Sequence, residues 1–399
     1  MITENEYAHW LFNVPGLGNK SIDKLLCSGM NCKEIYEADV KEFKGILTPA
    51  RIKSLENSKR SWDFELEAKK LKDKGISFIP RIDKRFPEKL KNIPDPPFAI
   101  YVKGNLPDPK KPSVAIIGAR LCSDYGRQMA RTFGRGLALA GVQVISGMAR
   151  GIDGISQKAA LEAGGTSYGI VGCGVDYIYP PENKPIYDQL CINGGVISEY
   201  PPGTEPKANF FPMRNRIISG LADIVLVIEA REKSGTQITV DTALEQGREV
   251  LAVPGRVTDR LSDGCNLLIS QGAGVAISVS DVLERLSHFA SVQKEKSEID
   301  SKDKSANPIC EIEAKDCSNA SSGNDEFSYE NLFEKEPEKT IDEEILDLID
   351  IIPVSASNII EGLNSRDIDI SIPQLMTKLM DLTYKGLILQ EGVYFRKKV

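Results

Sequence analysis

The chain has 399 residues, of which 41% are hydrophobic, and a formal net charge of −7. This length allows two or three globular domains with large cores. No run of 18 apolar residues occurs and the first ten residues are polar and acidic, so we predict a soluble, cytoplasmic protein with no signal peptide and no membrane partner.

The cysteines and histidines argue against a metal site and against common hydrolase sites. The eight cysteines form no C-x-x-C pair, and the only histidines are His9 and His288. The spacing of metal ligands is therefore not met. A Ser-His-Asp or Cys-His hydrolase is also disfavoured, because each needs a histidine beside its nucleophile. We expect reduced thiols, no metal, no cofactor and no catalytic residues.

The negative charge belongs to one segment near the C-terminal end. Residues 291–344 hold 7 lysines and 16 acidic residues. The net charge of this segment, −9, is more negative than the −7 of the whole chain. Of the 21 basic residues in 1–112, 17 are lysine, whereas 12 of the 16 basic residues in 113–290 are arginine. Arginine binds phosphate bidentately and stacks on bases, so the second region is the better candidate for a phosphate-binding surface.

Residues 1–75 are expected to form a helical domain. The stretch VPGLGNKSIDKLL, from Val14 to Leu26, places Gly16 and Gly18 in a tight turn before an amphipathic helix. Such a turn is typical of a helix-hairpin-helix element, whose glycines let backbone N–H groups approach a DNA phosphate. An ordinary helical hairpin explains these residues equally well, because the later stretch LTPARIKSL lacks a matching Gly-x-Gly.

The chain is organised around the stretch from Val114 to Gly141. Residues 114–117 are all apolar and predict a buried parallel strand, and residues 125–140 have helical spacing. Arg120 and Ser123 lie in the loop between them, a natural anion site because a helix begins there. The dinucleotide fingerprint G-x-G-x-x-G is absent. We therefore expect Arg120 to bind a phosphate through its guanidinium group, with a purely structural role for this arginine as the alternative.

Strand signals recur from Ser113 to about Ala290. They are separated by 24 to 29 residues, with helical patterns in most gaps, and begin near Val114, Val142, Thr166, Gly195, Asp223, Glu249 and Val275. This spacing predicts an α/β domain over residues 76–290 with a Rossmann-like, doubly wound, mainly parallel sheet. Ligands of such sheets bind outside the carboxyl ends of the strands.

Nearly every predicted strand end carries glycine, a hydroxyl residue or arginine. Ser146 and Gly147 follow the second strand, where glycine lets a ligand approach the backbone. Ser234, Gly235 and Thr236 stand at the start of a predicted helix, where an anion can dock. One such loop is weak support, but six at one edge of a sheet indicate a binding surface.

The stretch NFFPMRNR, residues 209–216, follows the fourth strand and leads into an apolar helix. Aromatic rings stack on unpaired bases, arginines neutralise phosphates, and an amide can pair with base edges. The residues expected to contact a nucleic acid here are Phe211, Arg214, Asn215 and Arg216. The alternative is that one phenylalanine belongs to the core and one arginine pairs with Glu229 or Glu199.

The composition changes beyond residue 290. Residues 291–339 are rich in Lys, Glu, Ser, Asp and Asn and poor in apolar residues, which predicts a disordered acidic linker. Residues 340–399 then show three helical patterns and a strand hairpin, typical of a winged-helix-like domain. The third helix is poor in base-reading residues, which favours a protein-binding or weak DNA-binding role.

A series of motifs resembles the DNA-processing protein A family, DprA or Smf. In chain order they are SGMARGID, GCGVDYIYP, SEYPPGT, FPMRNRIISGLAD, VIEA, SGTQIT, ALEQGREVLAVPG and GCNLLISQGA, and the resemblance covers roughly residues 78–276. It implies a Rossmann-like domain that binds single-stranded DNA, forms a homodimer and helps load the RecA recombinase onto incoming DNA in natural transformation.

The resemblance also implies which residues form the DNA-binding pocket. Carried over position by position, they are Arg120, Phe211, Arg214, Asn215, Arg216 and the glycine loop at Ser146 and Gly147, with Lys207 as a looser candidate. One departure is visible: Gln157 stands where the family commonly has a histidine. That substitution puts a side-chain role at this position in doubt.

Two other functions are compatible with the sequence. A Rossmann-like sheet with SGT at a helix start also resembles nucleotide-processing phosphoribohydrolases, in which Glu229, Glu199 or Asp153 would act as general acid or nucleophile on an N-glycosidic bond. The other is a regulatory protein whose winged helix reads duplex DNA. Because carboxylates at strand ends commonly pair with arginine, a non-enzymatic recombinase mediator that binds single-stranded DNA is the leading hypothesis.

Overall fold

The computed structural model of the chain describes residues 2–288, 340–349, 354–364, 368, 370–391 and 394–397. They fall into two compact units, one within Met1–Ser301 and the other within Lys302–Val399. The predicted linker, 291–339, lies outside the described residues.

The first unit begins with a group of short helices. They are α1 (Glu4–Phe12), α2 (Asn19–Leu26), α3 (Cys32–Glu37), the 3-10 helix η1 (Val40–Phe43), α4 (Pro49–Ser61) and α5 (Phe64–Asp73). Their shared core includes Trp10, which is fully buried and donates from Nε1 to Ser58 Oγ at 3.0 Å. The same core includes Phe78 and Tyr101 of the sheet, so these helices pack on the sheet and belong to the same unit.

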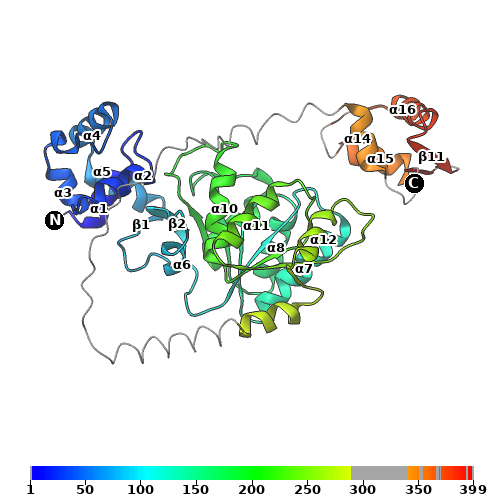
Figure 1. Cartoon of the computed structure of the whole chain (residues 1–399), viewed down its shortest axis with the longest axis horizontal. Coiled ribbons are helices and arrows are strands. Elements are labelled where there is room, and N and C mark those ends of the chain that lie inside the picture. The colour runs from blue at the N-terminus through cyan, green and yellow to red at the C-terminus, as the bar shows by residue number, and fades with distance from the viewer. Residues whose placement is uncertain are drawn as a thin grey trace. The chain divides into compact units, whose positions relative to one another are not determined.

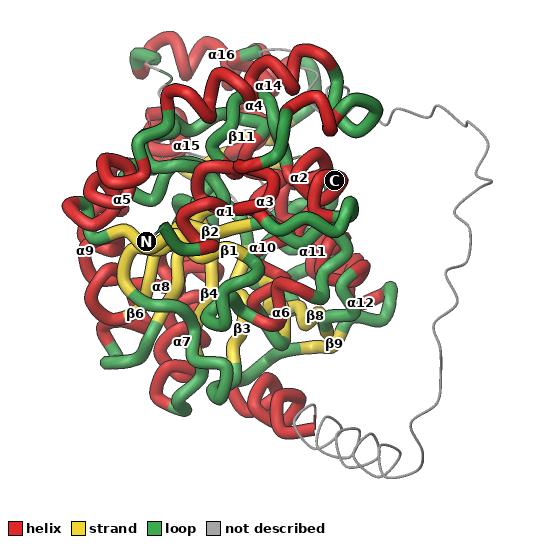
Figure 2. The backbone as a smooth tube through the Cα atoms, turned by 90° about the vertical axis from the view of Figure 1, so that its left-hand side faces the viewer, coloured by secondary structure: helices red, strands yellow, loops and turns green. Residues whose placement is uncertain are grey.

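A nine-stranded sheet forms the centre of this unit (Figure 1). Its strands are β1 (Ile76–Pro80), β2 (Ala99–Gly104), β3 (Ser113–Ile117), β4 (Gln143–Ser146), β5 (Ser167–Ile170), β6 (Gly194–Ser198), β7 (Ile224–Val227), β8 (Glu249–Ala252) and β9 (Gly274–Val275). Their order is β1-β2-β6-β5-β4-β3-β7-β8-β9. Seven strands, β3 to β9, are parallel, and β1 and β2 extend the sheet antiparallel at the β6 edge. In Figure 2, β6, β4, β3, β8 and β9 follow one another in this order.

Helices cover both faces of the sheet. They are α6 (Glu88–Lys91), α7 (Asp124–Leu139), α8 (Ile152–Glu162), η2 (Pro181–Asn183), α9 (Lys184–Asn193), α10 (Phe210–Leu221), α11 (Gly235–Glu245) and α12 (Asp263–Ser270). Alternate residues of β3 face opposite cores: Val114 lies in the core with residues of α7, whereas Ala115 lies in the core with residues of α10 and α11. Burial on both faces explains why the strand is apolar throughout.

The predicted fold class is confirmed. All seven predicted strands are present, and each begins within one residue of its expected position. The chain places β4, β5 and β6 on one side of β3 and β7, β8 and β9 on the other. The order therefore reverses between β3 and β7, and the crevice at their carboxyl ends is where a sheet of this type binds ligands.

The second unit is smaller. It contains α14 (Ile341–Leu348), β10 (Val354–Ser355), α15 (Ala356–Asn364), α16 (Ile372–Tyr384), β11 (Ile388–Glu391) and β12 (Tyr394–Lys397). The strands form an antiparallel sheet in the order β10-β12-β11. Ile345, Ile359, Leu375 and Phe395 share one apolar core. Its winged-helix character and its protein-binding or weak DNA-binding role stay predictions.

Candidate nucleic-acid interface

Glu229 joins the loops that follow β3 and β7 at the switch point. It accepts hydrogen bonds from the backbone N–H of Ser123 at 2.9 Å and from the Ser123 hydroxyl. Ser123 Oγ in turn accepts from Gly126 N and caps α7. A Cβ on Gly126 would stand 2.2 Å from Glu229 Oε2, so a larger residue here would displace the Glu229 carboxyl group. Burial raises the pKa of the Glu229 carboxyl, although the hydrogen bonds from Ser123 oppose that shift.

The buried Arg214 side chain forms hydrogen bonds to backbone oxygens at the ends of both β4 and β5. Its side chain is 5% exposed, and Nη1 donates to Gly147 O at 2.7 Å and to Ile170 O. A Cβ on Gly147 would stand 2.4 Å from this Nη1, which explains the glycine. Burial lowers the pKa of Arg214 to about 10, so it stays cationic at neutral pH. The neighbouring Asp153 accepts from Gly147 N at 3.0 Å.

Arg216 is equally buried but faces other partners. Its guanidinium donates to Glu199 Oε1 at 2.7 Å and to Asp95 Oδ2 at 2.9 Å. Glu199 also accepts from Asn19 Nδ2 at 2.6 Å, which links the start of α2 to this edge. Arg216 therefore forms the arginine–Glu199 pair that the structural alternative for this stretch anticipated.

The phenylalanines of the stretch 209–216 lie on the helix rather than in a loop. We expected the stretch to lead into a helix, but α10 already begins at Phe210. Pro212 is compatible with that start, because N–H groups in the first turn have no acceptor within the helix. Phe211 is half-buried, and Gly172 leaves room for its ring, since a Cβ there would stand 3.1 Å from Cδ1.

Four aromatic rings form two pairs, Tyr179 with Phe211 and Tyr200 with Phe210, and we call the two pairs together the aromatic strip. The ring centroids of Tyr179 and Phe211 are 5.5 Å apart, and Phe210 stacks on Tyr200 with centroids 4.1 Å apart. Tyr179 is 41% exposed, which leaves ring surface open to a ligand. The two tyrosines stand within the quoted motifs GCGVDYIYP and SEYPPGT, but an isolated aromatic residue in a loop shows no pattern that singles it out.

Cations stand over this strip. The Arg120 guanidinium carbon lies 5.7 Å from the Phe211 centroid, and that of Arg214 lies 6.0 Å from it. Lys207 Nζ lies 5.7 Å from the Phe210 centroid. Arg120 and Lys207 are exposed, whereas Arg214 is buried. The strip therefore combines open aromatic surface with two accessible positive charges.

The remaining predicted residues take other places at the same edge. Ser146 is fully buried and donates to Ile116 O at 2.6 Å, and Asn215 is half-buried on α10. Ser234 precedes α11, and its Oγ has no hydrogen-bond partner among the described residues. Gly235 has open space where a Cβ would stand, and Thr236 is half-buried.

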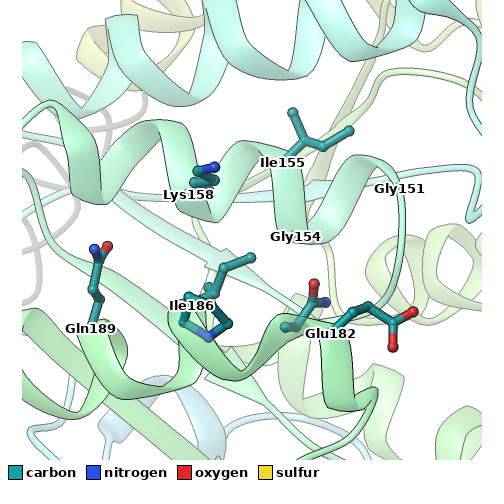
Figure 3. Close-up of a pocket in the computed structure, with 9 residues that line it drawn as sticks. Gly151, Gly154, Ile155, Lys158, Glu182, Ile186 and Gln189 are labelled. Carbon is teal, nitrogen blue, oxygen red and sulfur yellow. The ribbon is translucent and has the colours of Figure 1, made fainter.

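A separate hollow of about 340 Å³ lies beside the start of α8. Figure 3 shows Ile155 and Lys158 of α8 facing Ile186 and Gln189 of α9 across it. None of the residues predicted to contact DNA lines this hollow. Within the described ranges, no helix is long and apolar enough to cross a membrane, and no three His, Cys, Asp or Glu side chains are grouped to hold a metal ion.

Comparison with known proteins identifies relatives of this chain. The family model described as DNA recombination-mediator protein A matches residues 77–287. The DNA processing protein DprA of Streptococcus pneumoniae is 39% identical over 67% of this chain and 93% of its own length, and that of Bacillus subtilis is 41% identical over 54% and 73%. The X-ray structure of the S. pneumoniae protein superposes with a TM-score of 0.63 at 36% identity, covering 71% of this chain and 98% of that chain.

Proposed function

We propose that this chain, which belongs to the DNA recombination-mediator protein A family, binds single-stranded DNA along the aromatic strip. Membership of the family makes it a recombination mediator that acts in DNA processing. The observation that carries the proposal is the Phe211 ring at the carboxyl edge of the sheet, because the guanidinium carbons of the exposed Arg120 and the buried Arg214 lie 5.7 Å and 6.0 Å from its centroid.

The chemistry of the strip favours a single strand over a duplex. Bases stack on protein aromatic rings only when they are unpaired, and each stacked base contributes about 1–3 kcal/mol. Arg120 and Lys207 can reach phosphates because both are exposed beside the rings. A duplex would present its phosphates but keep its bases stacked inside, so it would use only the cations.

We infer different tasks for the other predicted residues. Arg214 and Arg216 hold the loops that support the strip, because both are buried and donate within the protein, Arg214 from Nη1 to Gly147 O and Arg216 to Glu199 and Asp95. The remaining group at the same edge consists of Ser123, Ser146, Gly147, Asn215, Ser234, Gly235 and Thr236, of which the buried Ser146 and Gly147 shape the loop rather than contact DNA. Of these, Gly235 is the most open to a ligand, because it is exposed at the start of α11 and has free space where a Cβ would stand.

We infer that the chain is not an enzyme. The three carboxylates considered for N-glycosidic chemistry are all engaged internally: Glu229 by Ser123, Glu199 by Arg216, and Asp153 by Gly147 N–H. A general acid or nucleophile must instead face its substrate.

The wider proposal concerns partners and place. We infer that this protein forms a homodimer in the cytoplasm and helps load the RecA recombinase onto the bound strand. The family's role as a recombination mediator supports this inference. RecA-dependent ATP hydrolysis on single-stranded DNA, with and without this protein, tests it.

Fluorescence anisotropy with a labelled oligothymidine and a matched duplex tests the DNA proposal. We expect single-strand preference, and we expect Arg120→Ala to weaken single-strand binding by about 10-fold or more. Arg60→Ala is the matched control, because Arg60 is an exposed arginine of α4 that pairs with Glu56. Equal affinity for both DNA forms, or equal effects of the two substitutions, would contradict the proposal.

A further inference from the structure

The outer face of α7 carries three arginines, Arg127, Arg131 and Arg135, which we call the arginine stripe. Residues four apart lie on one face of a helix, about 6 Å apart along its axis. All three are exposed, whereas Ala130, Phe133 and Leu137 form the buried face of the same helix. The stripe is therefore not needed for the packing of α7.

The charge of the stripe is nearly uncompensated. Arg127 lies 3.4 Å from Asp124, but both side chains are at least half exposed, so this pair is weak. Arg131 and Arg135 form no hydrogen bond or ion pair within the part of the chain that the structure describes. No acidic residue occurs in α7 after Asp124. The arginines of α10 differ, because they are buried and bonded.

The stripe is continuous with the candidate nucleic-acid interface. α7 begins at Asp124, four residues after Arg120, and is capped by Ser123 in the same loop. Its N-terminus lies at the carboxyl edge of the sheet, because it connects β3 to the parallel strand β4. The stripe therefore leads from the Arg120 loop away from that edge.

We propose that the arginine stripe is a further binding site for the DNA backbone. A strand whose bases stack on Phe211 passes Arg120 and continues along α7, where the three guanidinium groups bind successive phosphates. Guanidinium groups bind phosphate bidentately, which suits a repeating backbone. This inference rests on the proposed function, because it takes the strand at Phe211 as its starting point. It predicts that only DNA long enough to leave the strip uses the stripe.

Oligothymidines of two lengths, about 6 and about 20 nucleotides, test the proposal by fluorescence anisotropy. The variant is Arg127→Gln, Arg131→Gln, Arg135→Gln. Its control removes three exposed cations of α3, α4 and α5, each of which pairs with an acid one turn away on its own helix: Lys33→Gln, Arg60→Gln, Lys70→Gln. Both triple variants change the net charge equally, and we expect unchanged thermal unfolding for both because all the substituted side chains are exposed.

We expect the stripe variant to bind the longer oligothymidine roughly 30-fold more weakly at low salt and to bind the shorter one as wild type does. The slope of log affinity against log salt should become shallower by about 2, because three phosphate contacts on a single strand are lost. Affinity equal to that of the control at both lengths would overturn the proposal. An acidic polypeptide such as polyglutamate that bound the wild type and not the stripe variant, with DNA binding unchanged, would assign the stripe to a protein partner instead.

The outcomes separate the two proposals. Wild-type protein that binds neither oligothymidine would overturn both the proposed function and the stripe. Binding that depends on Arg120 but not on the stripe overturns only the further inference. Loss of affinity for the short oligothymidine in the stripe variant also overturns it, because the stripe would then belong to the strip itself.

Discussion

The arginines of α10 and α7 differ in spacing, two residues apart on α10 and four apart on α7, and have opposite environments in the structure. Arg214 and Arg216 on α10 are 5% and 7% exposed and bond to backbone and carboxylate oxygens. Arg131 and Arg135 on α7 are exposed, and neither has a partner in the described residues. Both helices lie beside the same edge of the sheet. The difference shows that arginines beside one edge of a sheet can either be bonded within the protein or leave their charge open to solvent.

This contrast separates effects on folding from effects on binding. A buried arginine that is removed leaves its acidic partner unpaired in a poorly solvated place, which costs stability. An exposed arginine that is removed costs little stability but loses a phosphate contact. Substituting Arg214 would therefore confuse the two effects, and Arg120 is the cleaner probe of binding.

The largest expected effect is on stability, from Arg216→Ala. Glu199, with a side chain only 12% exposed, would lose its cation, and we expect the free energy of unfolding to fall by about 3–5 kcal/mol. Arg60→Ala breaks the exposed pair with Glu56 and should cost less than about 1 kcal/mol. Urea denaturation of both variants measures the difference. Similar losses would mean that burial does not set the role of these arginines.

The next effect is on binding, from Phe211→Leu. Loss of the ring should weaken binding of single-stranded DNA by about 10-fold to 100-fold, because one or more bases lose their stacking partner. Phe211→Tyr keeps the ring and should bind as wild type does. Anisotropy titrations compare the three proteins. Equal binding by the leucine variant would show that the strip is a packing feature.

The smallest effect concerns Glu229, a buried carboxylate that has hydrogen-bond donors but no ion-pair partner in the described residues. Its pKa is raised by burial above the ordinary 4.5, so the folded state holds the proton more tightly than the unfolded state. The resulting stabilisation is full below pH 4.5 and is lost as the pH rises through the folded pKa. Glu229→Gln cannot titrate. The free energy of unfolding of this variant minus that of wild type should therefore increase from pH 4 to pH 7.5. Urea denaturation at each pH measures this difference, and a difference that stays constant would contradict the prediction.

The sheet was predictable from sequence because a parallel strand buried on both faces is an unbroken apolar run. Val114 to Ile117 is such a run, and equivalent runs repeat at the spacing that a strand and its returning helix require. The edge where ligands bind follows from the same pattern. The fold class, and with it the edge at which a sheet of this type binds ligands, was therefore accessible without coordinates.

The roles of individual side chains were not predictable in this way. Arg214 and Arg216 are two residues apart, so they leave α10 in different directions and meet partners from distant parts of the chain. Those partners, Gly147, Ile170, Glu199 and Asp95, share no local pattern with α10. For the same reason the sequence does not predict that Tyr179 and Tyr200 belong to the strip, because only tertiary packing brings them to Phe211 and Phe210.

Photocrosslinking tests the central claim, that single-stranded DNA lies on the aromatic strip, most directly. An oligothymidine that carries 5-iodouracil at one position is irradiated with the full-length protein, and the crosslinked peptide is identified by mass spectrometry. We predict crosslinks to Phe211 or Tyr179, which Phe211→Leu reduces. Crosslinks confined to residues 340–399, or spread over the surface without preference, would contradict the account.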